Sequence, residues 1–249
     1  MSTLLIDIGN TSASVGYSKH GKIVDTGHCP SRFQDANELE PLLTQHSVSK
    51  VVLASVVPTL DAQWIRALEK LGLPHPLQVN HRLELGVKID YPQPDSIGAD
   101  RLANAAAAAF QAGTPSVVCD FGTALTFDVL HASRGYIGGI ICPGLPLMFD
   151  YLSEKTALLP RVKPSKTEAV VGRNTPEAMQ IGARLGYRGM VREILTALQM
   201  ELDAPHLPVL CTGGYAKWIF EEWDFPVSID PLLTLRGLAR IAELNHPQP

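Results

Sequence analysis

Hydrophobic runs of strand length alternate along the chain with segments of helical periodicity. An apolar run begins at residue 2, a β-hairpin pattern surrounds His20-Gly21, and a second continuous apolar run ends at Pro58. The first half therefore predicts a strand, a hairpin, a helix, a strand and a helix, at residues 2–8, 14–26, 37–45, 51–57 and 60–71. This order is typical of an α/β layer with parallel strand pairing.

The second half continues the alternation after a proline-containing loop at residues 91–95. An Ala-rich segment at residues 99–111 predicts a helix. Further strands are predicted at residues 116–120, 125–130, 135–142 and 208–212, and further helices at residues 145–154, 216–223 and 232–244. Residues 176–202 predict either one long helix or two helices joined near residues 186–189.

Two aspartates mark a weak internal repeat. Asp7 and Asp120 each end an apolar strand, and each is followed by a hydrophobic residue, a glycine, a turn that contains threonine, and a hairpin. Asp120 lies 113 residues after Asp7, which is close to half of the 249 residues. Because the repeated unit is a supersecondary block, the sequence predicts two related α/β domains, at residues 1–112 and 113–249.

Composition limits the class of protein. Hydrophobic residues make up 45% of the chain and charged residues 18%, so a sizeable core is available. The net charge is −4 and no cluster of Lys and Arg stands out, which argues against nucleic acid as a partner. Apolar stretches fall well short of the ~18 residues that cross a bilayer, and the first residues do not resemble a signal peptide. We therefore expect no membrane partner and a cytoplasmic location.

The turn after Asp7 has the residue types of a phosphate-binding loop. Gly9 lets backbone amides approach a ligand closely, and Asn10 and Thr11 add side-chain donors. Asp7 could orient hydrated Mg²⁺ beside such phosphates. The same residues also suit a tight hairpin entry with an Asx turn. The segment is neither a Walker A loop nor a Rossmann fingerprint.

The segment from Asp120 to Asp128 has the same character. Two such loops that face one another could hold the phosphates of a nucleotide from both sides. The pair therefore favours phosphate binding more strongly than either loop does alone.

A third polar block, Gly98-Ala99-Asp100-Arg101, opens the Ala-rich helix. Asp100 falls in the first helical turn, where the helix dipole favours a carboxylate whether or not it has a function. Alternatively, Asp100 is a general base that accepts the proton of a substrate hydroxyl during phosphoryl transfer, and Arg101 clamps a carboxylate or phosphate. The residues alone leave both interpretations open.

Taken in order, these blocks resemble the type III pantothenate kinases, members of the acetate and sugar kinase/Hsp70/actin superfamily. The resemblance covers nearly the whole chain through blocks at residues 7–11, 98–101, 120–124, 139–144, 152–160, 172–175, 212–214 and 231–237. It implies two ribonuclease H-like, actin-like ATPase domains, each a mixed sheet flanked by helices, with the active site in the cleft between them. It also implies an enzyme that uses ATP to phosphorylate pantothenate to 4'-phosphopantothenate, the first step of coenzyme A biosynthesis.

The resemblance also implies roles for individual residues. Asp100 would be the catalytic proton acceptor, and Asp120 would bind the monovalent cation, K⁺ or NH4⁺, that this family typically needs. The pantothenate site would consist of Tyr91, Gly98, Ala99, Asp100, Arg101 and Thr175. The ATP site would consist of Asp7, Ile8, Gly9, Asn10, Thr11, Ser12, Ala13, Ser14 and Thr123. Since the family is commonly homodimeric, Thr175 of one subunit would complete the site of the other.

Some positions depart from the common family pattern near loops that face ligands. Gln93-Pro94-Asp95 stands where the family often has Asn followed by Glu, Ser14 replaces Lys or Thr, and Tyr215 stands where Asp is frequent. These departures bear on substrate packing and adenine contacts rather than on the class of reaction.

Two other functions stay open. One is a regulatory role in transcription, which members of this family have also been given, although a basic stripe and a helix-turn-helix signature are lacking. The other is a kinase or ATPase with a different acceptor, since a fold does not fix a function. The Gly98–Arg101 block argues against the second, because it matches pantothenate recognition.

Overall fold

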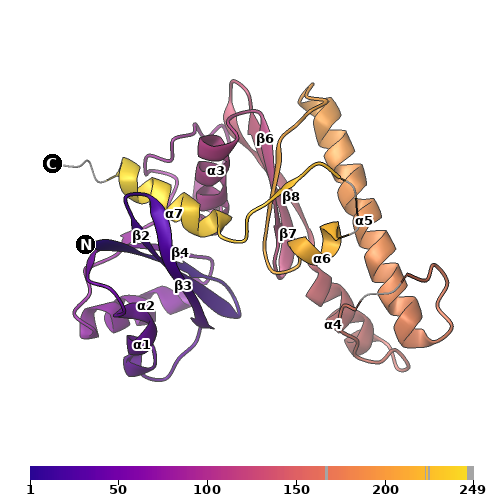
Figure 1. Cartoon of the computed structure of the whole chain (residues 1–249), viewed down its shortest axis with the longest axis horizontal. Helices are drawn as coiled ribbons and strands as arrows, with labels where there is room; N and C mark the ends of the chain where they lie inside the picture. The colour runs from indigo at the N-terminus through magenta and orange to yellow at the C-terminus, as the bar shows by residue number, and fades with distance from the viewer. Residues whose placement is uncertain (166–167, 222, 224, 246–249) are drawn as a thin grey trace. The chain divides into compact units, whose positions relative to one another are not determined.

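The computed structural model describes residues 1–165, 168–221, 223 and 225–245. The chain divides into two compact units, each built around its own five-stranded sheet (Figure 1). The first unit contains residues 1–114 and 132–138 together with the chain from residue 232 onward. The second contains residues 115–131 and 139–231. The last helix of the chain therefore belongs to the same unit as the first strand.

The first sheet has the strand order β3-β2-β1-β4-β5. Its strands are β1 (Ser2–Ile8), β2 (Ser12–Lys19), β3 (Lys22–Pro30), β4 (Val48–Ser55) and β5 (Leu77–Gln78). β1 pairs antiparallel with β2 and parallel with β4, and β4 is parallel to β5. The sheet is mixed, and the carboxyl ends of β1 and β4 meet at one edge.

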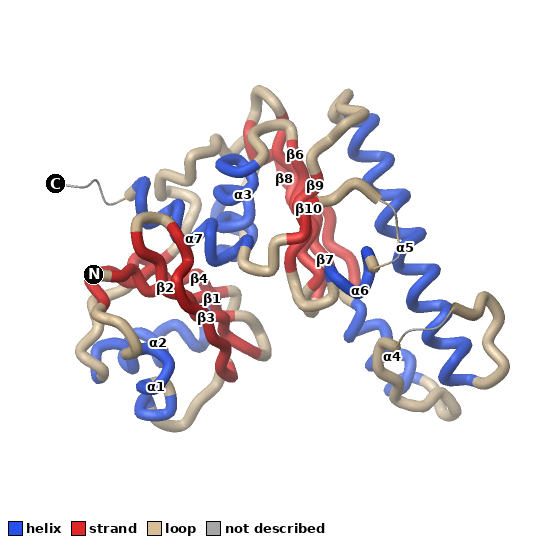
Figure 2. Tube along the Cα trace, viewed as in Figure 1, coloured by secondary structure: helices blue, strands red, loops and turns tan. Residues whose placement is uncertain are grey.

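Helices cover both faces of this sheet because the buried side chains of β1 alternate between two layers. On one face, Leu4 and Ile6 share a hydrophobic core with the fully buried Trp64 of α2 (Pro58–Lys70). On the other face, Gly16 of β2 lies against Leu235 of α7 (Leu233–Leu244). Figure 2 shows α2 and the short α1 (Glu40–Leu43) on one side of the sheet and α7 on the other.

The Ala-rich helix α3 (Ala99–Gln111) packs along α7 with almost no separation. A Cβ atom placed on Gly237 would overlap the carbonyl oxygen of Ala103, so the two helices touch through their backbones. The hydroxyl of Thr234 also donates a 2.8 Å hydrogen bond to Oδ1 of Asn104, which is fully buried. Because α7 contacts β1 to β4 as well, it joins α3 to the first sheet.

The second sheet repeats the topology of the first. It consists of β6 (Ser116–Phe121), β7 (Ala124–His131), β8 (Gly135–Pro143), β9 (Val209–Thr212) and β10 (Ser228–Ile229), in the order β10-β9-β6-β7-β8. β6 pairs antiparallel with β7 and parallel with β9, as β1 does with β2 and β4. The sequence repeat at Asp7 and Asp120 thus corresponds to two sheets of the same connectivity.

The second unit also contains α4 (Leu145–Lys155), α5 (Thr175–Glu201) and α6 (Ala216–Phe220). The helical pattern at residues 176–202 is one continuous helix, visible as the long α5 in Figure 1. Its start is fixed by Asn174, whose side chain accepts a 2.9 Å hydrogen bond from the backbone N–H of Glu177. Among the helices that the structure describes, none combines the length and apolarity needed to span a bilayer.

Two predicted helices differ from the structure. The prediction of one helix at residues 37–45 is wrong, since a 3-10 turn at Ala36–Glu38 is followed by the separate α1, with Pro41 near its start. Asp35 and Glu38 form a capping box that closes the turn as an independent unit. The helix predicted at residues 216–223 ends at Phe220, because the Arg188 side chain bonds the carbonyls of Ile219 and Glu221.

Candidate active site

The loop between β1 and β2 is anchored by a buried serine. The hydroxyl of Ser31 donates a 2.6 Å hydrogen bond to the carbonyl of Gly9, and its backbone N–H donates one of 3.2 Å to the carbonyl of Thr11. Trp64 donates its indole N–H to the carbonyl of Ser31 at 3.0 Å. The side chains of Asn10, Thr11 and Ser12 remain exposed. The loop is therefore fixed at its base and open at its tip, as a phosphate-binding loop requires.

The start of α3 lies beside the base of this loop. The backbone N–H of Val56 donates a 3.1 Å hydrogen bond to the carbonyl of Ile8, which links the ends of β4 and β1. Cγ1 of Val56 also lies 3.5 Å from the position that a Cβ would take on Gly98. The fold thus brings the first loop and the Gly98–Arg101 block together within one unit. Ligands of open α/β sheets bind at such an edge, outside the carboxyl ends of the strands.

Asp100 occupies the first turn of α3 and is mostly enclosed. Its Oδ1 accepts a 2.7 Å hydrogen bond from the backbone N–H of Arg101. Burial raises the pKa of the Asp100 carboxyl above its ordinary value, and this effect outweighs the lowering by that hydrogen bond and by the Arg101 charge. A carboxylate with a raised pKa is a better proton acceptor near neutral pH than an ordinary aspartate.

Arg101 lies in an aromatic corner of the first unit. Its guanidinium carbon is 5.8 Å from the ring centroid of Tyr136 on β8, and Tyr136 meets Tyr91 edge to face at 6.2 Å. Tyr136 is fully buried, whereas Tyr91 and Arg101 are partly exposed. Two of the predicted substrate residues, Tyr91 and Arg101, therefore contact the same buried ring.

The second loop follows Asp120 at the end of β6. The backbone N–H of Gly122 donates a 3.1 Å hydrogen bond to the carbonyl of Ala124, which leaves Thr123 exposed at the tip. Gly213 adopts a positive φ of 88° beside this turn. A Cβ on Gly213 would lie 2.6 Å from Oδ1 of Asp120, so only glycine allows the turn after β9 to come this close.

The surroundings of Asp120 suit a cation that is bound by few carboxylate side chains. Among the described residues, no group of three or more His, Cys, Asp or Glu side chains could hold a metal ion. A side chain at Gly213 would occupy the space beside Oδ1 of Asp120. A cation here would take its other ligands from backbone carbonyls, water and phosphate oxygens. These are the hard oxygen donors that K⁺ and Mg²⁺ accept.

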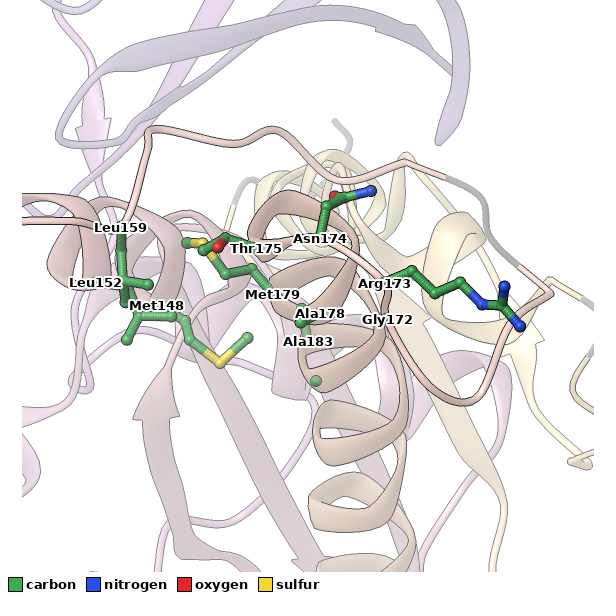
Figure 3. Close-up of a pocket in the computed structure, with 11 residues that line it drawn as sticks. Met148, Leu152, Leu159, Gly172, Arg173, Asn174, Thr175, Ala178, Met179 and Ala183 are labelled. Atoms are coloured by element: carbon green, nitrogen blue, oxygen red, sulfur yellow. The ribbon is translucent and has the colours of Figure 1, made fainter.

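Thr175 lies in the second unit, in a pocket of about 580 Å³ between α4 and the start of α5. Figure 3 shows Met148 and Leu152 of α4 across from Met179 of α5, with Arg173 pointing away from them. The other lining residues are Leu159, Gly172, Asn174, Ala178, Gly182 and Ala183. Asp120, which belongs to the same unit, does not line this pocket.

Comparison with known proteins decides the family. The sequence model described as "Type III pantothenate kinase" matches residues 3–197. A type III pantothenate kinase of Akkermansia muciniphila is 43% identical over 246 residues, which cover 98% of this chain and 100% of that protein. A type III pantothenate kinase of Methylacidiphilum infernorum is 37% identical over 242 residues, which cover 97% of this chain and 88% of that protein. The chain belongs to the type III pantothenate kinase family.

Solved structures bear on the fold of this family member. A putative Baf family transcriptional activator of Campylobacter jejuni superposes with a TM-score of 0.63 at 20% identity, over 96% of this chain and 97% of that one. A ROK family glucokinase of Streptomyces griseus, solved with glucose and AMPPNP, gives a TM-score of 0.51 at 15% identity, over 98% and 99% of the two chains. The predicted fold class, two mixed sheets flanked by helices as in actin-like kinases, is confirmed.

Three residues that support the candidate site were missed by sequence reasoning. Ser31 and Trp64 hold the first loop, and Tyr136 holds Arg101 and Tyr91. None of them lies in a motif that the sequence singles out. The signal for Trp64 and Tyr136 was an apolar pattern that predicts burial, and such a pattern does not show which loop a residue supports. Ser31 lies in a polar stretch and had no such signal.

Proposed function

We propose that this chain transfers the γ-phosphoryl group of ATP to the primary hydroxyl of pantothenate, with Asp100 as the general base. Membership of the type III pantothenate kinase family supports the reaction, and the placement of Asp100 beside the first phosphate loop supports the role. The same proposal places the chain in the cytoplasm as a soluble enzyme of coenzyme A biosynthesis.

Phosphoryl transfer depends mainly on alignment and on stabilisation of charge. In this proposal the first loop, from Asp7 to Ser14, binds the ATP phosphates and donates hydrogen bonds from its exposed tip at residues 10–12. Thr123 does so from the second loop. Arg101 binds the pantothenate carboxylate and Tyr91 packs against the substrate. Asp100 then accepts the hydroxyl proton as the new O–P bond forms.

Two cations fit the residues present. Mg²⁺ supplies charge neutralisation on the phosphates when bound, and Asp7 at the end of β1 could orient its water shell. Asp120, beside the close turn at Gly213, is the proposed ligand of K⁺ or NH4⁺. Both carboxylates stand at the carboxyl end of a strand that pairs in parallel with its neighbour.

The deciding experiment is a coupled ATP assay with pantothenate, run in K⁺ and in Na⁺ buffers. Turnover that depends on pantothenate supports the proposal. Absence of turnover with every nucleotide and cation tested would overturn it. An electrophoretic shift with duplex DNA over a range of salt concentrations tests the regulatory alternative, and a shift without pantothenate turnover would favour that role.

Replacing Asp120 by alanine is expected to abolish activation by K⁺. The reason is that a carboxylate oxygen would be lost from a site with few other charged ligands. In a K⁺ titration the Asp120→Ala enzyme should show the same low rate at every concentration, whereas Glu193→Ala, at an exposed position on α5, should respond as the wild type does. Unchanged activation of Asp120→Ala would remove the cation role.

The proposed homodimer gives Thr175 a role in the site of the partner. Mixing Asp100→Asn chains with Thr175→Ala chains would then form heterodimers in which one of two sites has both native residues. Random pairing should restore about a quarter of the wild-type rate at low pantothenate concentration, above either variant alone. If the mixture performs no better than the sum of the separate variants, Thr175 does not act across subunits.

A further inference from the structure

Tyr136 is a buried tyrosine at the start of β8 that belongs to no sequence motif discussed above. Its ring is fully buried and lies between two residues of the proposed pantothenate site. The guanidinium of Arg101 faces the ring at 5.8 Å from its centroid, and the edge contact with Tyr91 is at 6.2 Å with an interplanar angle of 69°. One ring thus contacts both side chains.

The backbone around Tyr136 is bonded to the segment that precedes Tyr91 through a single parallel β-bridge between Tyr136 and Ile89. The N–H of Tyr136 donates a 2.8 Å hydrogen bond to the carbonyl of Lys88, and its carbonyl accepts a 2.9 Å bond from the N–H of Asp90. The side chains of Arg134 and Asp90 form an ion pair across the same two segments. Tyr136 therefore cannot shift without breaking the two backbone hydrogen bonds of this bridge, which lies directly before Tyr91.

Close packing fixes the other side of Tyr91. Gly138 has a positive φ of 124°, and a Cβ at that position would lie 3.1 Å from Cε2 of Tyr91. The Tyr91 ring thus packs against the backbone of Gly138 on one side and makes the edge-to-face contact with Tyr136 on another. Its orientation is set before any ligand arrives.

We propose that Tyr136 is a positioning residue that preorganises Arg101 and Tyr91 for a small substrate bearing a carboxylate. The inference rests on the proposed function. An arginine side chain loses considerable rotamer freedom when it is fixed on a ligand. A cation–π contact with Tyr136 restricts the guanidinium in advance, so less of this cost falls on binding.

The effect should appear in KM for the carboxylate substrate. An interaction made equally in the ground state and the transition state changes KM and leaves kcat alone. In this proposal Tyr136 acts only through Arg101 and Tyr91, so kcat and the KM for ATP should stay close to wild type. A purely structural role would instead change all three values together.

The test uses rings of nearly the same shape but different charge distribution. Tyr136→Phe keeps the ring face, and we expect less than about a 3-fold rise in KM for pantothenate. Pentafluorination of that Phe ring reverses the quadrupole, and Tyr136→Leu removes the ring, so each should raise KM by roughly 3- to 30-fold. Fluorination alters volume little, which keeps the test valid even if Tyr136→Leu does not fold.

A double-mutant cycle with Arg101→Met isolates the contact. In that background, pentafluorination of position 136 should raise KM for pantothenate by less than it does in the presence of Arg101, because only the contact with Tyr91 remains to be disturbed. Equal KM values for the fluorinated and unfluorinated rings in the presence of Arg101 would overturn the inference, as would a parallel fall in kcat. Absence of pantothenate turnover in the wild type would instead overturn the proposed function, so the two failures are distinguishable.

Discussion

Replacing Asp100 by asparagine is expected to lower kcat by roughly 10²- to 10⁴-fold, the usual loss when a general base is removed. Asn has nearly the same shape but cannot accept the hydroxyl proton. A coupled ATP assay at saturating pantothenate measures the loss directly. Asp203→Asn, an exposed position just after α5, is the matched control and should retain wild-type turnover.

The same substitution should leave the fold intact and not lower its stability. Burial raises the pKa of the folded Asp100 carboxyl above its unfolded value, so ionisation of this group opposes folding. That cost is absent below the unfolded pKa, grows as the pH rises from the unfolded to the folded pKa, and is fully present above the folded pKa. Asn carries no charge and avoids the cost. Thermal unfolding at pH 7 should therefore give a Tm for Asp100→Asn at or above that of the wild type.

The pH dependence of kcat/KM should report the ionisation of the Asp100 carboxyl. A base must be ionised to act, so kcat/KM should fall as the pH drops through the Asp100 pKa. Because that pKa is raised, the fall should begin at a higher pH than an ordinary aspartate, with a pKa near ~3.9, would give. An Asp100→Asn enzyme with near-normal turnover and an unchanged acid limb would contradict the assignment.

Replacing Gly237 by alanine is expected to produce the largest loss of stability. The added Cβ would overlap the carbonyl oxygen of Ala103, and neither backbone can yield without separating α3 from α7. Overpacking of this kind typically costs about 1–3 kcal/mol, and the cost here should fall at or above the upper end because the clash is with backbone. Thermal unfolding should show a Tm lower by roughly 5–10 °C.

Gly189→Ala provides the matched control for this experiment. Gly189 lies within α5, and no heavy atom outside the adjoining residues and backbone of that helix would lie within 4 Å of a Cβ at that position. Alanine favours a helix interior over glycine, so this variant should be more stable by about 0.5–1 kcal/mol. A Gly237→Ala protein as stable as Gly189→Ala would show that the contact between α3 and α7 is looser than the structure indicates.

The Gly237 variant should also lose activity beyond its loss of stability. α3 carries Asp100 and Arg101 at its start, and α7 holds α3 against the first sheet. A change in the spacing of the two helices would move Asp100 relative to the first loop. Asp100→Asn and Gly237→Ala therefore give opposite combinations, one inactive but stable and the other unstable.

The sequence by itself determined the elements and their chemistry. The apolar runs at residues 2–8 and 116–120 predicted β1 and β6, and the Ala-rich segment predicted α3 with the bounds that the structure shows. These predictions succeed because strand and helix periodicities are local properties of the chain. The repeat at Asp7 and Asp120 was also visible, since both copies retain the strand, glycine and hairpin order.

Only the tertiary structure decided which distant residues meet. The bond between Asn104 and Thr234 joins positions 130 residues apart, and with Gly237 it places the last helix against α3 in the first unit. Likewise Ser31 supports Gly9, and Tyr136 faces Arg101. No local pattern encodes such contacts, because each depends on the packing of two elements whose order in space is set by the whole core. The sequence motifs identify the side chains that can bind ligands or transfer protons, and tertiary packing determines which of these side chains lie close enough to act together.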